Sequence, residues 1–124
     1  MTQYEPLYLQ GIARFNRRDY FESHEIWEDL WIASQGPARL FYKGLIQAAV
    51  ALHHLDRGNM HGATKLLAGC RKYLADYRPW YLGLDVDAFL GQMTQCVSPH
   101  ASGQPRPPDG HRPVICLSPE VQRQ

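Results

Sequence analysis

The stretch LFYKGLIQAAVAL, residues 40–52, is apolar on nearly every face of a helix. A helix that is hydrophobic all round has to be covered by protein on all sides. The pattern predicts a helix from about Pro37 to Arg57, because Gly36 and Pro37 precede it and Gly58 follows it. We therefore expect this segment to be the central element of a fold in which other elements pack around it.

Four further segments repeat apolar residues at steps of three and four, which is typical of amphipathic helices. The first runs from about Pro6, a natural first-turn residue, to Asn16, and the second is DYFESHEIWEDLWIA with Asp19 as its cap. A fourth helix begins after Asn59 and is terminated by Pro79, and a short fifth is capped by Asp85. Apolar residues of these last two helices are Met60, Ala63, Leu67, Cys70, Leu74, Tyr77, Val86, Phe89, Leu90 and Met93. With no strand pattern or repeat and only short connections, the sequence predicts an all-α, compact bundle of about five helices.

The end of the chain has a different composition. Six of the nine prolines lie between Pro99 and Pro119, and the only apolar patch there is 114–117, Val-Ile-Cys-Leu. Proline removes backbone donors and favours extended, solvated chain. The prediction is a bundle domain over 1–97 and a Pro-rich, irregular or partly disordered tail over 98–124. The patch is interpreted as part of a loosely attached terminus, with a short strand or a docked arm as alternatives.

Overall composition excludes several functions. Lys and Arg number 13 against 12 for Asp and Glu, so the formal charge is +1 and no strong field exists to attract nucleic acid. No apolar run reaches the roughly 18 residues of a membrane span, and the start lacks the features of a secretion signal. The three cysteines include no CxxC pair, which argues against a disulfide framework or a cysteine zinc site. We expect a cytoplasmic protein with reduced thiols and no membrane or nucleic-acid partner.

The second helix carries an unusual polar pair. Phe21, His24, Glu28 and Trp31 fall on one stripe of that helix, where His24 and Glu28 are spaced i, i+4 and can touch. The aromatic surround, which includes Trp27, is expected to shield the pair from water. A buried carboxylate without a partner costs several kcal/mol, so Glu28 needs compensation.

Three sources of compensation remain open. Protonated His24 can pair with Glu28, or the second polar stripe formed by Lys43, Gln47 and His54 on the third helix can contact it. The third source is a shared metal ion, discussed next. The favoured interpretation is a histidine and a glutamate that satisfy each other and a few amide or backbone groups, as buried networks that set helix register do.

A metal site is the alternative that would give the pair a catalytic role. Imidazole and carboxylate both suit zinc, manganese or iron, and bundle metal sites use such side chains from facing helices. The candidate ligands are His24, Glu28, His53 and His54, and Glu25 would then be the general base of a hydrolase. The run His-Glu-x-x-Glu matches only the first half of the zincin motif HExxH.

Other notable residues favour structural roles. Trp27 and Trp31 are interpreted as core or subunit-contact aromatics, since the neutral charge does not support base stacking. Gly44 is expected to let a neighbouring helix approach the third helix closely. Cys70 belongs to the apolar stripe of the fourth helix and is expected to behave as a small hydrophobe.

Five separated motifs occur together in this sequence. They are Tyr20-Phe21-Glu22-x-His24-Glu25-x-Trp27-Glu28-x-x-Trp31, Gly44-Leu45-Ile46-Gln47, Leu52-His53-His54, Gly58-Asn59-x-x-Gly62-Ala63 and Gly83-Leu84-Asp85. Over roughly residues 10 to 92 the chain thereby resembles the bacterial and archaeal family DUF309, a domain of unknown function. The resemblance implies a compact helical bundle with no established activity and assigns no catalytic residue. It implies that Gln47 and His54 are counterparts of the second-helix motif, and the tail after Val97 departs from the family pattern.

Three functions are compatible with these observations. The favoured hypothesis is a non-enzymatic module that forms a homo-oligomer or binds a partner, because its aromatic residues exceed what a small interior can cover. On this hypothesis no cofactor is needed. A divalent-metal enzyme using His24, Glu28 and a histidine of the third helix is the alternative. A pocket whose His24–Glu28 pair grips a small polar ligand is the third.

Overall fold

The computed structural model describes residues 3–101 and 112–118 of the chain. Its five helices confirm the all-α prediction, and within the described residues no helix is both long and apolar enough to cross a membrane. The elements in chain order are α1 (Pro6–Asn16), α2 (Tyr20–Ala33), α3 (Arg39–Asp56), α4 (Met60–Leu74), the 3-10 turn η1 (Ala75–Tyr77), β1 (Trp80–Tyr81), β2 (Leu84–Asp85) and α5 (Val86–Ala101).

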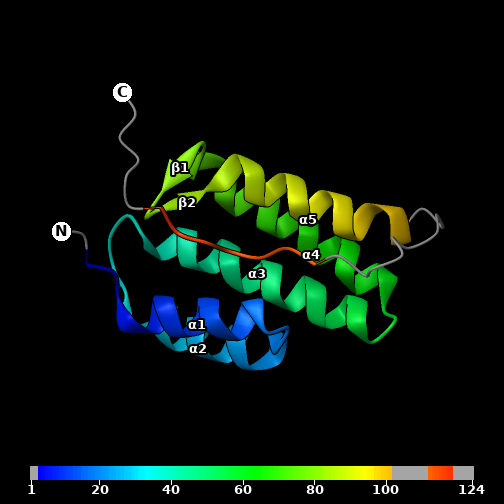
Figure 1. Ribbon diagram of the computed structural model, residues 1–124, viewed down its shortest axis with the longest axis horizontal. Coiled ribbons are helices and arrows are strands. Elements are labelled where there is room, and N and C mark those ends of the chain that lie inside the picture. Colours follow the sequence, from blue (N-terminus) through cyan, green and yellow to red (C-terminus); the bar gives the residue numbers. More distant parts are fainter. Residues whose placement is uncertain (1–2, 102–111, 119–124) are drawn as a thin grey trace.

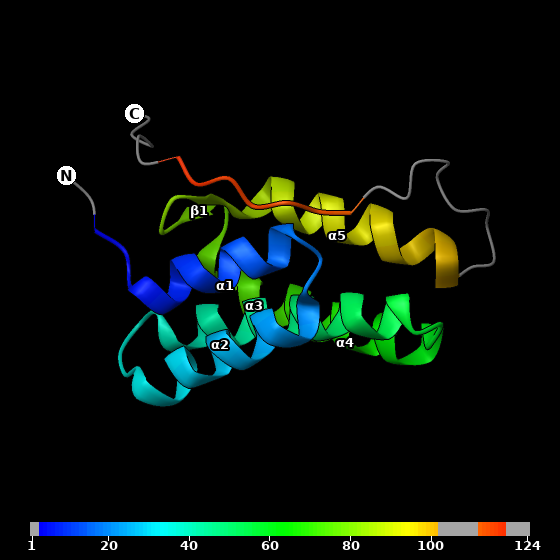
Figure 2. The same cartoon turned by 60° about the horizontal axis from the view of Figure 1, so that its bottom comes forward.

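The helices form two layers. α3 packs between α2 and α4, while α1 contacts α2 and α5 contacts α4. Figure 2 shows α1 and α5 on the same side of the layer formed by α2, α3 and α4. Figure 1 shows residues 112–118, drawn in red, running along the gap between α1 and α5. We call this segment the strap.

α3 is the central helix, as its composition predicts. Leu45, Leu52 and the three alanines at 48, 49 and 51 have no exposed surface. A side chain at Gly44 would overlap Leu74 of α4, so the glycine permits the close approach of α3 and α4 that the sequence indicated. Cys70 is fully buried in α4, which confirms its interpretation as a core residue.

The predicted caps differ in outcome. The Asn59 side chain accepts a hydrogen bond from the Gly62 amide at 3.0 Å, and Asp85 accepts one from the Ala88 amide at 2.9 Å, so both cap their helices as expected. Asp19 makes no capping bond to α2. Its carboxylate lies 3.7 Å from a guanidinium nitrogen of Arg14 on the preceding helix.

A small hairpin before α5 was not predicted. β1 and β2 pair antiparallel, with Trp80 opposite Asp85 and Tyr81 opposite Leu84. The turn residues Leu82 and Gly83 both have positive φ, at 47° and 81°, as a tight two-residue hairpin turn requires. Strands of two residues are too short to show an alternating pattern, which explains why the sequence gives no sign of them.

The strap corrects the prediction of a loosely attached terminus for residues 112–118. Ile115 is only 2% exposed, and the Asn16 side chain binds both backbone groups of Ile115: its amide donates to the carbonyl at 2.9 Å and its oxygen accepts from the N–H at 2.8 Å. Arg112 binds Asp56 at the end of α3, at 2.8 Å. α5 also continues to Ala101, past the predicted domain end at 97. The remaining predicted tail, residues 102–111 and 119–124, lies outside the described part of the chain.

Candidate functional site

The His24–Glu28 pair exists but does not lie in the interior. His24 Nε2 is 3.9 Å from Glu28 Oε1, and His24 Nδ1 lies 2.9 Å from the carbonyl oxygen of Phe21. The Glu28 side chain is 47% exposed, and Phe21, expected to shield it, is 51% exposed. The prediction of a buried His/Glu cluster is therefore wrong for Glu28, whose carboxylate water can solvate without any further partner, whereas the His24 side chain is 21% exposed.

The buried stripe of α2 is displaced from the predicted one. It consists of Tyr20, Ser23, Trp27 and Leu30. Because Ser23 is polar, the apolar pattern of the sequence does not reveal this stripe. Ser23 is nevertheless fully buried and donates a hydrogen bond to the Gly11 carbonyl at 2.9 Å. The only signal that could have revealed it is the i, i+4 spacing of Ser23 and Trp27.

Trp27 is a core residue and does not belong to the polar cluster. Its indole N–H donates to the Tyr8 carbonyl at 3.2 Å, and its ring centroid lies 5.7 Å from that of Phe15. The ring covers Gly11 so closely that a Cβ there would overlap it. This confirms the interpretation of Trp27 as a core aromatic and removes it from the candidate site.

The predicted α3 residues are divided between two neighbouring helices. His53 lies beside Phe21 of α2, with ring centroids 5.6 Å apart. Its pKa is lowered, first by desolvation and then by nearby positive groups, of which Arg57 is the largest. Gln47 and His54 instead lie against Gly69 and Gly62 of α4, so they do not contact the α2 pair.

Trp31 is half-buried at the other end of α2 and is covered by two cations of α3. The Arg39 guanidinium carbon lies 4.2 Å from the Trp31 ring centre, and the Lys43 ammonium lies 4.5 Å from it. These are cation–π distances. Lys43 therefore contacts the aromatic ring and not Glu28.

The candidate metal ligands do not come together. No group of three or more His, Cys, Asp or Glu side chains that could hold a metal ion occurs among residues 3–101 and 112–118. The set formed by His24, Glu28, His53 and His54 is excluded as a preformed centre by this geometry, since catalytic zinc sites use three protein ligands. Glu25 is exposed on α2 and has no such centre beside it.

His24, Glu25 and Glu28 lie on the side of α2 opposite its buried stripe. We call the side of α2, α3 and α4 that faces away from α1 and α5 the outer face. Its charges are segregated. α2 has four carboxylates and no Lys or Arg, while α4 has three cations and no carboxylate. The carboxylates are Glu22, Glu25, Glu28 and Asp29. Of the α4 cations, Lys65 and Lys72 are assigned to the outer face, whereas Arg71 points toward α5, where it binds Thr94.

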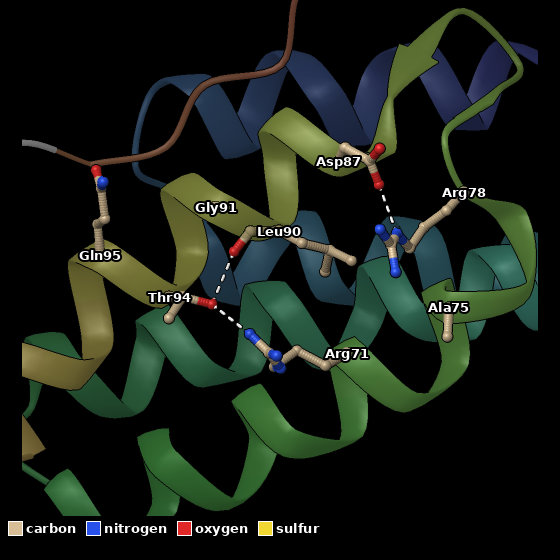
Figure 3. A pocket seen from close by; sticks show the side chains of 8 residues that line it. All are labelled: Arg71, Ala75, Arg78, Asp87, Leu90, Gly91, Thr94 and Gln95. Carbon is tan, nitrogen blue, oxygen red and sulfur yellow. Dashed lines mark hydrogen bonds and ion pairs between the residues drawn. The ribbon is translucent and has the colours of Figure 1, made fainter.

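A second feature, which the sequence did not indicate, is a pocket between α4 and α5 (Figure 3). Its volume is about 710 Å³. None of the predicted site residues lines it. The lining residues are Arg71, Ala75, Arg78, Asp87, Leu90, Gly91, Thr94 and Gln95. We call it the α4–α5 pocket.

Comparison with known proteins relates part of the chain to a family. The family model described as "Domain of unknown function (DUF309)" matches residues 8–66. Over these residues the chain matches DUF309. The match covers most of α1, all of α2 and α3 and the first half of α4, so it includes the His24–Glu28 motif and Gln47, whereas all residues of the α4–α5 pocket lie beyond it. The DUF309 match confirms the resemblance seen in the sequence and assigns no activity.

Two relatives extend the similarity beyond the DUF309 match. The chain is 41% identical over 94 residues to "Uncharacterized protein YpuF" of Bacillus subtilis, which covers 73% of this chain and 54% of YpuF. It is 24% identical over 92 residues to an uncharacterized protein of Aquifex aeolicus, covering 73% of this chain and 28% of that protein. The chain thus spans about half the length of YpuF and less of the Aquifex protein.

Proposed function

We propose that this domain is a non-enzymatic module that self-associates through its outer face, with a second copy of the chain as the occupant. The observation that supports this proposal is the segregation of charge across that face. The carboxylates of α2 and the exposed Lys65 and Lys72 of α4 lie on either side of α3. A surface of this kind is complementary to itself.

Symmetry explains why the second copy is the preferred occupant. In a two-fold dimer the same patch is used by both subunits, so each contact occurs twice. A two-fold axis passing near α3 would place the acidic α2 of one subunit over the basic α4 of the other. Both pairs of opposite charge would then form at once.

Exposed apolar side chains supply the area that such an interface needs. Phe21, Ile32 and Leu40 are 51%, 66% and 50% exposed on α2 and α3. Large apolar side chains grouped on one face mark interaction surfaces more often than scattered ones do. Trp31 is half-buried and has Arg39 and Lys43 on its ring. Trp and Arg are among the residue types that dominate binding energy in interfaces.

The two other hypotheses lose their structural support. A metal-dependent hydrolase needs a set of ligands that the described residues do not bring together. A ligand pocket built on the His24–Glu28 pair needs a cavity beside those side chains, and neither of them lines the α4–α5 pocket. The outer face is better suited to a macromolecular contact than to either chemistry.

The first test is sedimentation velocity of the full chain over a range of concentrations. Wild type is expected to form a dimer, and Ile32→Asp is expected to shift the equilibrium toward monomer by about tenfold or more, because it places a charge within the apolar contact. Leu9→Asp is the matched control, since Leu9 is 44% exposed but lies on α1, away from the outer face. A strict monomer at millimolar concentration, or equal effects of both variants, would contradict the proposal.

The second test uses charge reversal and mixing. The variant Lys65→Glu/Lys72→Glu and the variant Glu25→Lys/Glu28→Lys are each expected to dissociate, because like charges then oppose each other. Mixing the two places opposite charges in both α2–α4 pairs, so a heterodimer is expected, and its affinity should fall with added salt. If the wild type dimerises but the mixture does not, the dimer uses another surface.

A further inference from the structure

We propose that the α4–α5 pocket binds a small molecule carrying a phosphate group. This inference does not depend on the proposed self-association, because the pocket and the outer face share no residue that either proposal uses. Figure 3 shows the guanidinium groups of Arg71 and Arg78 entering the pocket from the α4 side, opposite the α5 residues Asp87 and Thr94.

A hydrogen bond positions the Arg71 guanidinium group, and further N–H donors of the group remain for a ligand. Its Nη1 donates to the Thr94 hydroxyl oxygen at 2.7 Å, and that hydroxyl donates in turn to the Leu90 carbonyl at 2.8 Å. The hydroxyl is therefore oriented by the helix and fixes the guanidinium across the space between α4 and α5. Among the residues that the structure describes, the remaining N–H groups of Arg71 have no acceptor. An arginine is a planar fork of five donors that matches phosphate oxygens.

Arg78 provides a second anchored cation. Its Nε donates to Asp87 Oδ1 at 2.5 Å, which leaves both terminal amino groups without an acceptor in the described part of the chain. The lining residues include two arginines and one carboxylate, so the pocket has a formal charge of +1. Asp87 neutralises only part of the positive charge, and an anion can supply the rest.

Gly91 lines the α5 side of the pocket. It lies within α5, where glycine is roughly 1 kcal/mol less favourable than alanine. A Cβ at the other described helical glycines would meet a neighbouring side chain closely: Trp27 at Gly11, Leu74 at Gly44, His54 at Gly62 and Gln47 at Gly69. A Cβ at Gly91 would meet nothing within 4 Å. Packing against a neighbouring side chain therefore does not require this glycine.

The volume indicates a ligand larger than a bare anion. About 710 Å³ lies within the range of roughly 300–1,000 Å³ that small-molecule sites occupy. Ala75 and Leu90 add apolar wall beside the arginines. This combination fits a phosphate monoester, whose phosphate would bind the guanidinium groups while its organic part contacts the apolar wall.

The test is a titration of the full chain with phenyl phosphate, followed by amide chemical shifts in NMR spectra. Saturable shifts are expected at Gly91 and Thr94, with inorganic phosphate binding about tenfold more weakly because it lacks the apolar part. Benzoate tests whether a carboxylate suffices, and phenol tests the ring alone. Binding of benzoate as tight as that of phenyl phosphate would overturn the assignment to phosphate.

Variants locate the site. Arg71→Gln and Arg78→Gln are each expected to weaken phenyl phosphate binding about tenfold or more. Arg17→Gln is the matched control, because Arg17 is exposed directly after α1 and neither lines the pocket nor belongs to the outer face. Gly91→Leu is expected to abolish binding while raising the melting temperature, because it fills the pocket and improves helix propensity. Shifts that do not saturate, or an equal loss in Arg17→Gln, would show adventitious anion binding only and overturn the proposal.

Discussion

Two polar contacts of this protein differ in how far apart their residues lie in the sequence and in where they lie in the fold. His24 and Glu28 are one turn apart on α2 and form a contact at 3.9 Å on the surface. Asn16 and Ile115 are 99 positions apart, yet the Asn16 side chain binds both backbone groups of Ile115, at 2.9 and 2.8 Å. The local pair attracts attention in the sequence, while the remote pair attaches the strap to α1.

The difference shows what helical spacing can and cannot predict. Spacing of i, i+4 guarantees that two side chains are neighbours, and His24 and Glu28 are. It does not say which way their common face points, because that depends on the contacts that the other faces of the helix make with neighbouring elements. In α2, Ser23 and Trp27 bind the backbone of α1 at Gly11 and Tyr8, and these contacts turn the His24–Glu28 side outward.

The largest effect is expected from truncating the strap's buried side chain. Ile115→Ala should lower the free energy of unfolding by about 2–4 kcal/mol, since a buried isoleucine is replaced by a cavity. Phe21→Ala, on the exposed face, should change it by no more than about 0.5 kcal/mol. Urea denaturation followed by circular dichroism compares the two directly. Similar losses for both variants would show that the strap is not part of the core.

A smaller effect is expected from removing the side chain that binds the strap. Asn16→Ala should cost about 1–2 kcal/mol, because two backbone groups of Ile115 lose their partner. Gln92→Ala is the matched comparison, since Gln92 accepts one bond from the Val114 amide, at 3.2 Å. Hydrogen exchange of the Ile115 amide should accelerate in Asn16→Ala. Unchanged protection of that amide would contradict the described contact.

The exposed pair is expected to contribute little. Glu28→Gln should change stability by at most about 0.5 kcal/mol, because a solvated i, i+4 pair gains little from its charges. A double-mutant cycle with His24→Ala isolates the coupling between the two side chains. A coupling of several kcal/mol would restore the buried cluster that the sequence indicated.

The smallest effect concerns pH. Desolvation lowers the pKa of His53 below its usual 6.5, so the unfolded chain binds a proton more readily than the folded one in the window just below that value. Stability from this group is therefore complete above pH 6.5 and falls as the pH drops toward the folded pKa. Denaturation midpoints between pH 7 and 5 should decline less in His53→Gln than in wild type. An equal decline would show that other groups dominate in this range.

Much of the architecture could be predicted, and particular residues show why the rest could not. The all-round apolar run of α3 and the caps Asn59 and Asp85 are local signals, and each appears in the structure as expected. The hidden core position of Ser23 depends on its partner in α1, the Gly11 carbonyl. This outcome follows from packing between helices, which one helix does not encode.

The candidate sites divide in the same way. The residues of the outer face were identified, because His24, Glu28 and Trp31 lie on a single helix. The α4–α5 pocket was missed, because Arg71, Arg78, Gly91 and Thr94 come from separate segments and none is unusual alone. Only the packing of α5 on α4 brings them together.

The amino-acid sequence by itself determined the helices, the burial of α3 and the neighbours along each helix, because periodicity and capping act within one turn of chain. Tertiary structure alone decided that the His24–Glu28 side of α2 faces water, that Ile115 completes the core and that two arginines share a pocket. Each of these outcomes depends on contacts between distant segments, whose free energies compete only once the helices have packed.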